Sequence, residues 1–146
     1  MGAPSNYDSD FYAWAMEQAA LIRAGNLAAV DLEHVAEEIE SMGKTEKREL
    51  IGRLNVLLLH LLKWRYQPGF RSRSWRLSVE EQRYRLEGHL RDNPSLKAKL
   101  PETIADAYHI ARVEAERETG FPRATFPETC PWSFDQISDD DFWPEA

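Results

Sequence analysis

Residues 50–62 place the strongest constraint on how this chain folds. If the segment is helical, apolar side chains cover nearly the whole circumference of that helix: Leu50, Ile51, Leu54, Val56, Leu57, Leu58, Leu59, Leu61 and Leu62. A helix that is apolar all round is buried on several sides. We therefore predict a central helix over residues 45–66, which Pro68 and Gly69 terminate.

Helical periodicity continues on both sides of this segment. We expect helices over residues 9–24, 32–42 and 75–91, and a last helix that ends near residue 119. In the first two, spacings of three and four residues predict buried faces, which comprise Phe11, Trp14, Ala15, Gln18, Leu21 and Ile22, and then Leu32, Val35, Ala36, Ile39 and Met42. Gly43 is expected to end or bend the second helix. The predicted fold class is all-α, a single-domain helical bundle of four or five helices.

The C-terminal part of the chain is acidic but also aromatic. We expect a flexible N-terminus over residues 1–8, the helical bundle over 9–119 and an extension over 120–146. The extension carries apolar side chains at a density that usually indicates packing: Phe126, Trp132, Phe134, Ile137, Phe142 and Trp143. Ser133 is a suitable N-cap for a short helical turn. We therefore expect the extension to pack on the bundle.

Size and cysteine content limit the class of protein. A chain of 146 residues is the size of one domain, and about two-thirds of its surface can be buried on folding. Its one cysteine, Cys130, excludes an intrachain disulfide and favours a reducing compartment. The N-terminus does not resemble a signal peptide. The most apolar stretch, residues 54–62, is far shorter than the about 20 residues of a membrane span. We expect a cytoplasmic protein without a membrane partner.

Charge is divided between acidic ends and a basic middle. The net charge is −7, but residues 1–42 carry −7, residues 63–91 carry +5 and residues 126–146 carry −6. One interpretation is internal complementarity, in which the acidic ends pack near the basic middle. The alternative is that the charged segments are surfaces for a partner.

The basic middle contains a candidate patch for a phosphate or another acidic partner: Arg71, Arg73, Trp75 and Arg76. An arginine cluster around an aromatic ring can bind phosphate or stack on bases. The sequence pI of about 5.1 disfavours nucleic acid as the partner of the whole chain. Phosphate or nucleic-acid binding is therefore kept as an alternative.

The common catalytic and metal-binding motifs are absent from the sequence, which predicts no cofactor and no metal and argues against catalysis. The most unusual polar residue is His60, which lies in the leucine-rich segment. It is either a core histidine with a hydrogen-bond partner on a neighbouring helix, or part of a polar pocket. The pocket would combine Glu38, His60, Lys63 and Arg83, and would make the chain an enzyme or a small-ligand binder.

The whole chain resembles the bacterial domain-of-unknown-function 29 family. The resemblance rests on segments that follow one another in the order Asp10-Phe11-Tyr12-Ala13-Trp14, Glu37-Glu38-Ile39-Glu40-Ser41-Met42-Gly43, His60-Leu61-Leu62-Lys63-Trp64, Gln67-Pro68, Arg73-Ser74-Trp75, Gln82-Arg83, Asn93-Pro94-Ser95-Leu96, Tyr108 with Ala111-Arg112, Phe126-Pro127 and Cys130-Pro131-Trp132. It implies an all-helical fold and a bacterial cytoplasmic setting. It implies no activity, cofactor or catalytic residue.

Together these observations predict a small cytosolic protein-interaction or regulatory module without catalysis. The split charge and the aromatic extension offer surfaces for a protein partner, whose identity the sequence does not reveal. The polar pocket and the basic patch are the two alternatives.

Overall fold

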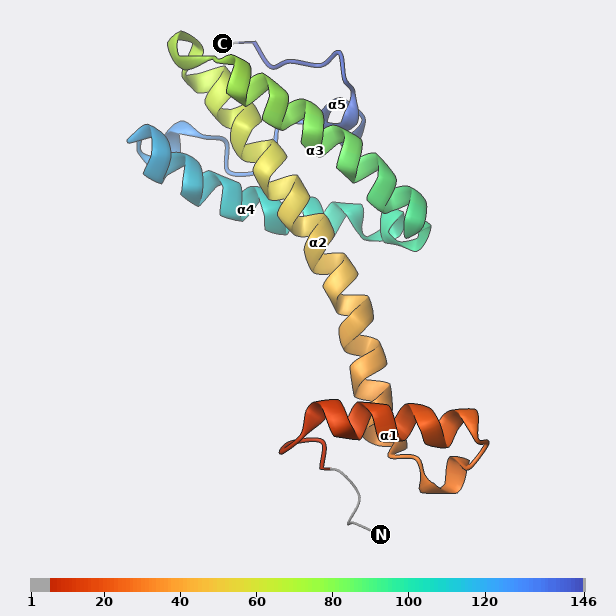
Figure 1. The fold of residues 1–146 in the computed structure, drawn as a ribbon. Helices are drawn as coiled ribbons and strands as arrows, with labels where there is room; N and C mark the ends of the chain where they lie inside the picture. The colour runs from red at the N-terminus through yellow and green to blue at the C-terminus, as the bar shows by residue number, and fades with distance from the viewer. Residues whose placement is uncertain (1–5, 146) are drawn as a thin grey trace. The chain divides into compact units, whose positions relative to one another are not determined.

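The computed structural model describes residues 6–145, and every regular element within them is a helix (Figure 1). In chain order the elements are α1 (Phe11–Arg23), η1 (Leu27–Ala29), α2 (Leu32–Tyr66), η2 (Pro68–Phe70), α3 (Arg73–Asp92), η3 (Pro94–Lys99), α4 (Leu100–Thr119), η4 (Arg123–Thr125) and α5 (Phe134–Ser138). The predicted all-α fold is confirmed. Contacts divide the chain into unit 1 (Met1–Thr45) and unit 2 (Glu46–Ala146). Of the N-terminus expected to be flexible, residues 1–5 lie outside the described part.

Helix α2 has 35 residues and replaces the two helices predicted over 32–42 and 45–66. The expectation that Gly43 ends a helix is wrong, because α2 continues through this position. A glycine inside a helix costs only about 1 kcal/mol relative to alanine. The residues around Gly43 are mostly good helix formers, so the helix continues through it. Within residues 6–145, neither α2 nor another helix combines the length and apolar character needed to cross a membrane.

Unit 1 consists of α1, η1 and the first turns of α2. Asp10 caps α1 by accepting a hydrogen bond from the backbone N–H of Ala13 at 3.1 Å. Asp31, at the start of α2, holds the two helices together. Its carboxylate accepts a hydrogen bond from Trp14 Nε1 at 3.2 Å, and its backbone N–H donates to Gln18 Oε1 at 2.7 Å. These contacts place Trp14 and Gln18 between the helices, where both are buried.

The apolar faces predicted for the two helices of unit 1 are mostly not buried. Trp14 and Gln18 are buried as expected. Large members of the same faces are 45–69% exposed: Phe11, Ile22, Leu32, Ile39 and Met42. The prediction that these faces are buried is therefore wrong for the larger part. The reason is the small size of unit 1, in which two short stretches of helix cover only the sides that face each other.

The core lies in unit 2 and is built around the second half of α2, as the sequence predicts. Leu50, Leu54, Leu57, Leu58, Leu61 and Leu62 are fully buried there. Residues of α3 and α4 complete the cluster, among them Val79, Leu86, Ala107, Tyr108 and Ala111. In Figure 1, α3 (green) returns beside the second half of α2 (yellow). The predicted central helix is confirmed for this part of α2.

The C-terminal extension packs on the core of unit 2, which confirms that prediction. Phe126, Trp132 and Ile137 are buried, and the ring centroid of Trp143 lies 4.4 Å from that of Trp64 on α2. Tyr108 donates a hydrogen bond to the carbonyl of Pro127 at 2.6 Å. Ser133 caps α5 in a reciprocal capping box with Gln136. The extension therefore reaches the core through both apolar and polar contacts.

Candidate functional site

The four residues of the predicted pocket lie in both units. Glu38 belongs to unit 1, where its carboxylate accepts a hydrogen bond from the hydroxyl of Tyr7. This bond raises the pKa of Tyr7 to about 12, because the negative carboxylate stabilises the protonated hydroxyl. His60 belongs to unit 2, and its Nδ1 donates to the carbonyl of Val56 on the preceding turn of α2 at 2.7 Å.

The other two members, Lys63 and Arg83, also have partners of their own. Lys63 Nζ lies 3.4 Å from a carboxylate oxygen of Glu118 and 4.7 Å from the centroid of the Trp75 ring. Arg83 is buried and donates to two backbone carbonyls of the C-terminal extension. Within residues 6–145, no hydrogen bond or ion pair joins any two of the four side chains. The pocket stays a prediction.

Three of the four residues of the basic patch contact other residues of the chain, and the fourth is exposed. Arg71 donates from Nε to the carbonyl of Trp64 at 2.7 Å and lies 4.9 Å from that ring. Trp75 lies under the ammonium group of Lys63. Arg76 forms an ion pair with Glu80 at 3.1 Å, and Arg73 is exposed. Phosphate binding by this patch stays a prediction.

A groove opens on the surface of unit 1 between α1 and α2, and we refer to it as the unit 1 groove. It has a volume of about 440 Å³ and is lined by Phe11, Trp14, Ala15, Gln18, Ala19, Ile22, Val35, Glu38, Ile39 and Met42. Eight of the thirteen exposed large apolar side chains in the described part of the chain belong to this unit: Phe11, Tyr12, Met16, Ile22, Leu27, Leu32, Ile39 and Met42. Exposed apolar surfaces of this size occur at protein–protein interfaces and at ligand-binding grooves in other proteins.

Aromatic and acidic side chains meet beside this groove. The rings of Tyr7 and His34 stack with their centroids 4.1 Å apart. His34 Nδ1 donates to a carboxylate oxygen of Asp31 at 2.7 Å. This hydrogen bond raises the pKa of His34 and lowers the pKa of Asp31, because it is strongest when both groups are charged.

The pair of His34 and Asp31 is expected to stabilise unit 1 most fully between pH 3.8 and pH 6.5, the ordinary pKa values of the two groups. Because the pKa of His34 is raised, its contribution is complete below pH 6.5 and is lost as the pH rises through the folded pKa. Because the pKa of Asp31 is lowered, its contribution is lost only as the pH falls through the folded pKa. An NMR titration of the His34 ring should show the raised pKa. Asp31→Asn should return it toward 6.5, and Glu33→Gln should not.

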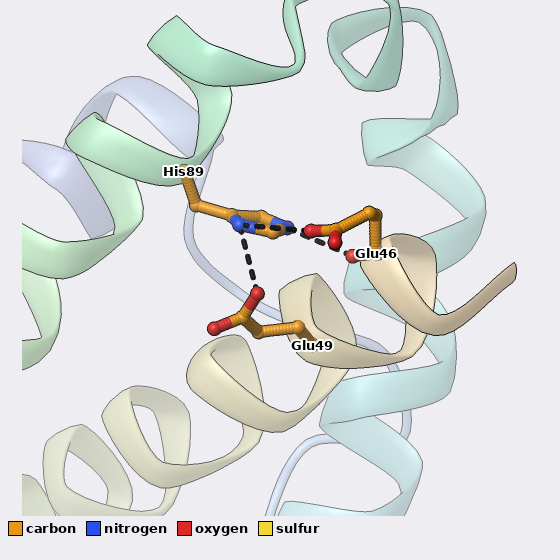
Figure 2. Close-up of side chains that lie close together, drawn as sticks. All are labelled: Glu46, Glu49 and His89. Atoms are coloured by element: carbon orange, nitrogen blue, oxygen red, sulfur yellow. Dashed lines mark hydrogen bonds and ion pairs between the residues drawn. The ribbon is translucent and has the colours of Figure 1, made fainter. Parts of the chain in front are cut away.

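A second cluster, in unit 2, joins the first residues of that unit to α3 (Figure 2). The Nδ1 atom of His89 lies 3.1 Å from a carboxylate oxygen of Glu49 and 3.8 Å from one of Glu46. The Nε2 atom of the same ring lies 2.8 Å from the backbone carbonyl oxygen of Glu46. His89 is buried, whereas the side chains of Glu46 and Glu49 are 46% and 41% exposed. We call these three residues the His89 cluster.

The His89 cluster faces a cavity of about 500 Å³, whose lining also includes Arg53, Arg85, Gly88, Asp92 and Asn93. Arg53 donates to the second carboxylate oxygen of Glu49 at 2.7 Å. This hydrogen bond is the largest cause that holds the pKa of Glu49 below its ordinary value, and the charge of His89 acts in the same direction. At neutral pH Glu49 is therefore ionised, and its carboxylate lies between the guanidinium group of Arg53 and the ring of His89.

The sequence does not predict the His89 cluster, because its residues come from two helices that are far apart in the chain. The available signal was the pair of glutamates at 46 and 49, which share one face of a helix. Nothing in their spacing points to residue 89.

The helices, the buried leucine core and the packed extension together define a small all-α protein with candidate sites on each unit. The chain belongs to the family described as Domain of unknown function DUF29, whose model matches residues 6–143. The resemblance noted in the sequence is thus confirmed over nearly the whole chain. No curated protein and no solved structure matches the chain.

Proposed function

We propose that this chain is a protein-interaction module, which binds a basic amphipathic helix of a partner protein in the unit 1 groove. The observation that carries the proposal is the exposed apolar face of unit 1. In the described part of this unit, Trp14 and Val30 are the buried large apolar side chains, while eight others are exposed. An acidic module with so little core of its own gains stability when a partner covers this face.

The shape of the groove suits a helix. On α1 its lining extends from Phe11 to Ile22, a length of about 16 Å, or three helical turns. Between these two large side chains lie Ala15 and Ala19, whose small size leaves room for the side chains of a partner. Met42 lines the opposite side, and methionine adapts its shape to different apolar partners. Recognition of a helix in an apolar groove is a common mode of peptide binding.

Charge decides which kind of helix fits. Residues 1–42 carry eight acidic residues and one basic residue. Glu38 lies in the lining of the groove itself. A second copy of the chain would bring a second acidic segment, with a net charge of −7 over residues 1–42, next to the first, which opposes self-association. A helix with an apolar stripe and basic side chains beside it matches both the apolar lining of the groove and the negative charge around it.

Calorimetric titration of the full chain with a synthetic peptide tests this proposal. The probe is an amphipathic leucine–lysine helix of about 14 residues, long enough to fill three turns of the groove. We expect saturable one-to-one binding. Ile39→Lys should weaken it at least about tenfold, or by about 1.4 kcal/mol, because it places a positive charge in the apolar lining. Leu77→Lys is the matched control, since Leu77 is an exposed leucine on α3 of unit 2.

Two further measurements decide the result. A scrambled peptide of the same composition should bind clearly more weakly, and equal binding would show that charge alone attracts the peptide. Analytical ultracentrifugation of the chain should show a monomer. A dimer that Ile39→Lys dissociates would assign the groove to a second copy and would overturn the proposal of a basic partner.

A further inference from the structure

We propose that Glu46, Glu49 and His89 form a binding site for a divalent transition-metal ion, with zinc as the best match. The ligand atoms are Nδ1 of the histidine and one carboxylate oxygen of each glutamate, and they lie within 4.8 Å of one another. This site is independent of the unit 1 groove, because all three residues belong to unit 2. The inference therefore stands or falls separately from the proposed function.

The hydrogen bond of the histidine ring determines which nitrogen faces the carboxylates as a ligand. A backbone carbonyl oxygen only accepts hydrogen bonds, so the Nε2 atom of His89, 2.8 Å from the carbonyl of Glu46, carries a hydrogen. In the neutral ring, Nδ1 then has a free lone pair. The carboxylate oxygen nearest to Nδ1 is that of Glu49, at 3.1 Å (Figure 2). In that neutral state the two acceptors repel each other, and either a proton on Nδ1 or a metal ion bound by both groups removes the repulsion.

The spacing of the ligand atoms suits tetrahedral zinc. Zinc lies about 2.0–2.2 Å from nitrogen and oxygen ligands, so two ligands at the tetrahedral angle are about 3.4 Å apart. The two distances from His89 Nδ1 to the glutamates, 3.1 and 3.8 Å, lie on either side of that value. Both glutamate side chains are partly exposed, so they can rotate by the small amount that closure around an ion requires.

The outer contacts of the cluster are those of a metal site. Histidine ligands usually donate their second ring N–H to a carbonyl or carboxylate, as His89 does to the carbonyl of Glu46. Arg53 binds one carboxylate oxygen of Glu49 and leaves the other directed at the histidine. The positive charges of Arg53 and Arg85 oppose a metal ion, but Arg85 forms an ion pair with Glu81, and Glu46 and the cavity-lining Asp92 supply further negative charge.

The environment also indicates how the coordination would be completed. Three protein ligands leave a fourth position of the tetrahedron, and the cluster faces a cavity of about 500 Å³ that water can enter. One nitrogen and two oxygen ligands suit zinc and its first-row neighbours better than soft metals such as Cu(I). The site is thus of the open type, with a position for water.

Titration of the metal-free full chain with zinc chloride, followed by calorimetry, tests the inference. We expect one ion per chain. Cobalt chloride serves as a spectroscopic probe, and its visible absorption should report four-coordinate geometry at the same site. Glu46→Gln should lower the affinity at least about tenfold, the lower end of what even an outer partner of a metal site contributes. His109→Gln should change nothing, since this exposed histidine lies on α4 away from the cluster.

Two variants keep the test decisive. His89 is buried, so His89→Gln can disturb folding, whereas Glu46→Gln changes a partly exposed side chain and should retain the helical circular dichroism of the wild type. Failure of the wild-type chain to bind zinc would mean that a proton alone bridges the cluster, and would overturn the inference. Zinc binding and a cobalt spectrum that Glu46→Gln leaves unchanged would overturn it as well.

Discussion

Alanine in place of Leu58 is expected to lower the free energy of unfolding by about 2–5 kcal/mol. Leu58 is fully buried in the core of unit 2, in the segment of α2 that is apolar on nearly all sides. Truncation loses the transfer free energy of the removed methyl groups and leaves a cavity that the neighbouring helices fill only in part. Urea denaturation followed by circular dichroism measures the change.

Leu77→Ala is the control for this measurement. The chemical change is the same, but Leu77 lies on α3 and is 43% exposed, so we expect an effect within about 0.5 kcal/mol. If Leu58→Ala costs less than about 1 kcal/mol, the second half of α2 is not central to the core. Comparison of the two variants separates loss of core packing from any general effect of alanine on helix stability.

The core and the extension could be predicted from the sequence because their signals are strong and local. The leucines between residues 50 and 62 are too numerous for one helical face, so burial on several sides was the only good solution. The extension combined an N-cap at Ser133 with aromatic side chains too dense for an exposed segment. The leucine-rich segment and the aromatic extension can each be recognised from residues that lie close together in the sequence.

Unit 1 shows where local signals fail. Gly43 is a helix-weakening residue in the sequence, yet α2 continues through it because its neighbours favour the helix. The apolar face with Ile39 and Met42 predicted burial, and the face is exposed. Amphipathic spacing indicates that one face of a helix is apolar enough to be buried. It does not indicate whether the surface that buries this face belongs to the same chain.

The candidate sites depend on contacts between distant segments. The His89 cluster joins residues about forty positions apart, and the orientation of its ring is set by a backbone carbonyl that leaves no trace in the sequence. The predicted pocket starts from one unusual residue, His60, and its members Lys63 and Arg83 are each bound to other partners in the fold. An unusual residue type in the sequence does not indicate which distant side chains lie beside it.

Arg83→Met is expected to lower the free energy of unfolding by about 3–5 kcal/mol, since a hydrogen bond from a charged donor contributes about 1.5–3 kcal/mol. Arg83 is 2% exposed, and its guanidinium group donates from Nε to the carbonyl of Ile137 at 2.8 Å and from a terminal nitrogen to the carbonyl of Phe142 at 2.7 Å. It also lies 5.3 Å from the centroid of the Trp143 ring. Methionine fills similar space but leaves both carbonyls without this donor.

The same substitution should also release the C-terminal extension. Burial lowers the pKa of Arg83, while the negative charges of Asp140 and Asp139 oppose that shift, so one buried cation is balanced by the acidic segment beside it. Without this cation, repulsion among those acids favours detachment. Limited proteolysis should then cut the extension faster, and the fluorescence of Trp143 should shift toward that of an exposed tryptophan.

Two further variants identify the cause. Arg83→Lys keeps the charge but cannot reach both carbonyls with the planar fork of a guanidinium group, so we expect an intermediate loss. Arg76→Met removes an arginine that is about half exposed and paired with Glu80, and should cost at most about 1 kcal/mol. If Arg83→Met leaves both stability and proteolysis unchanged, apolar contacts alone hold the extension.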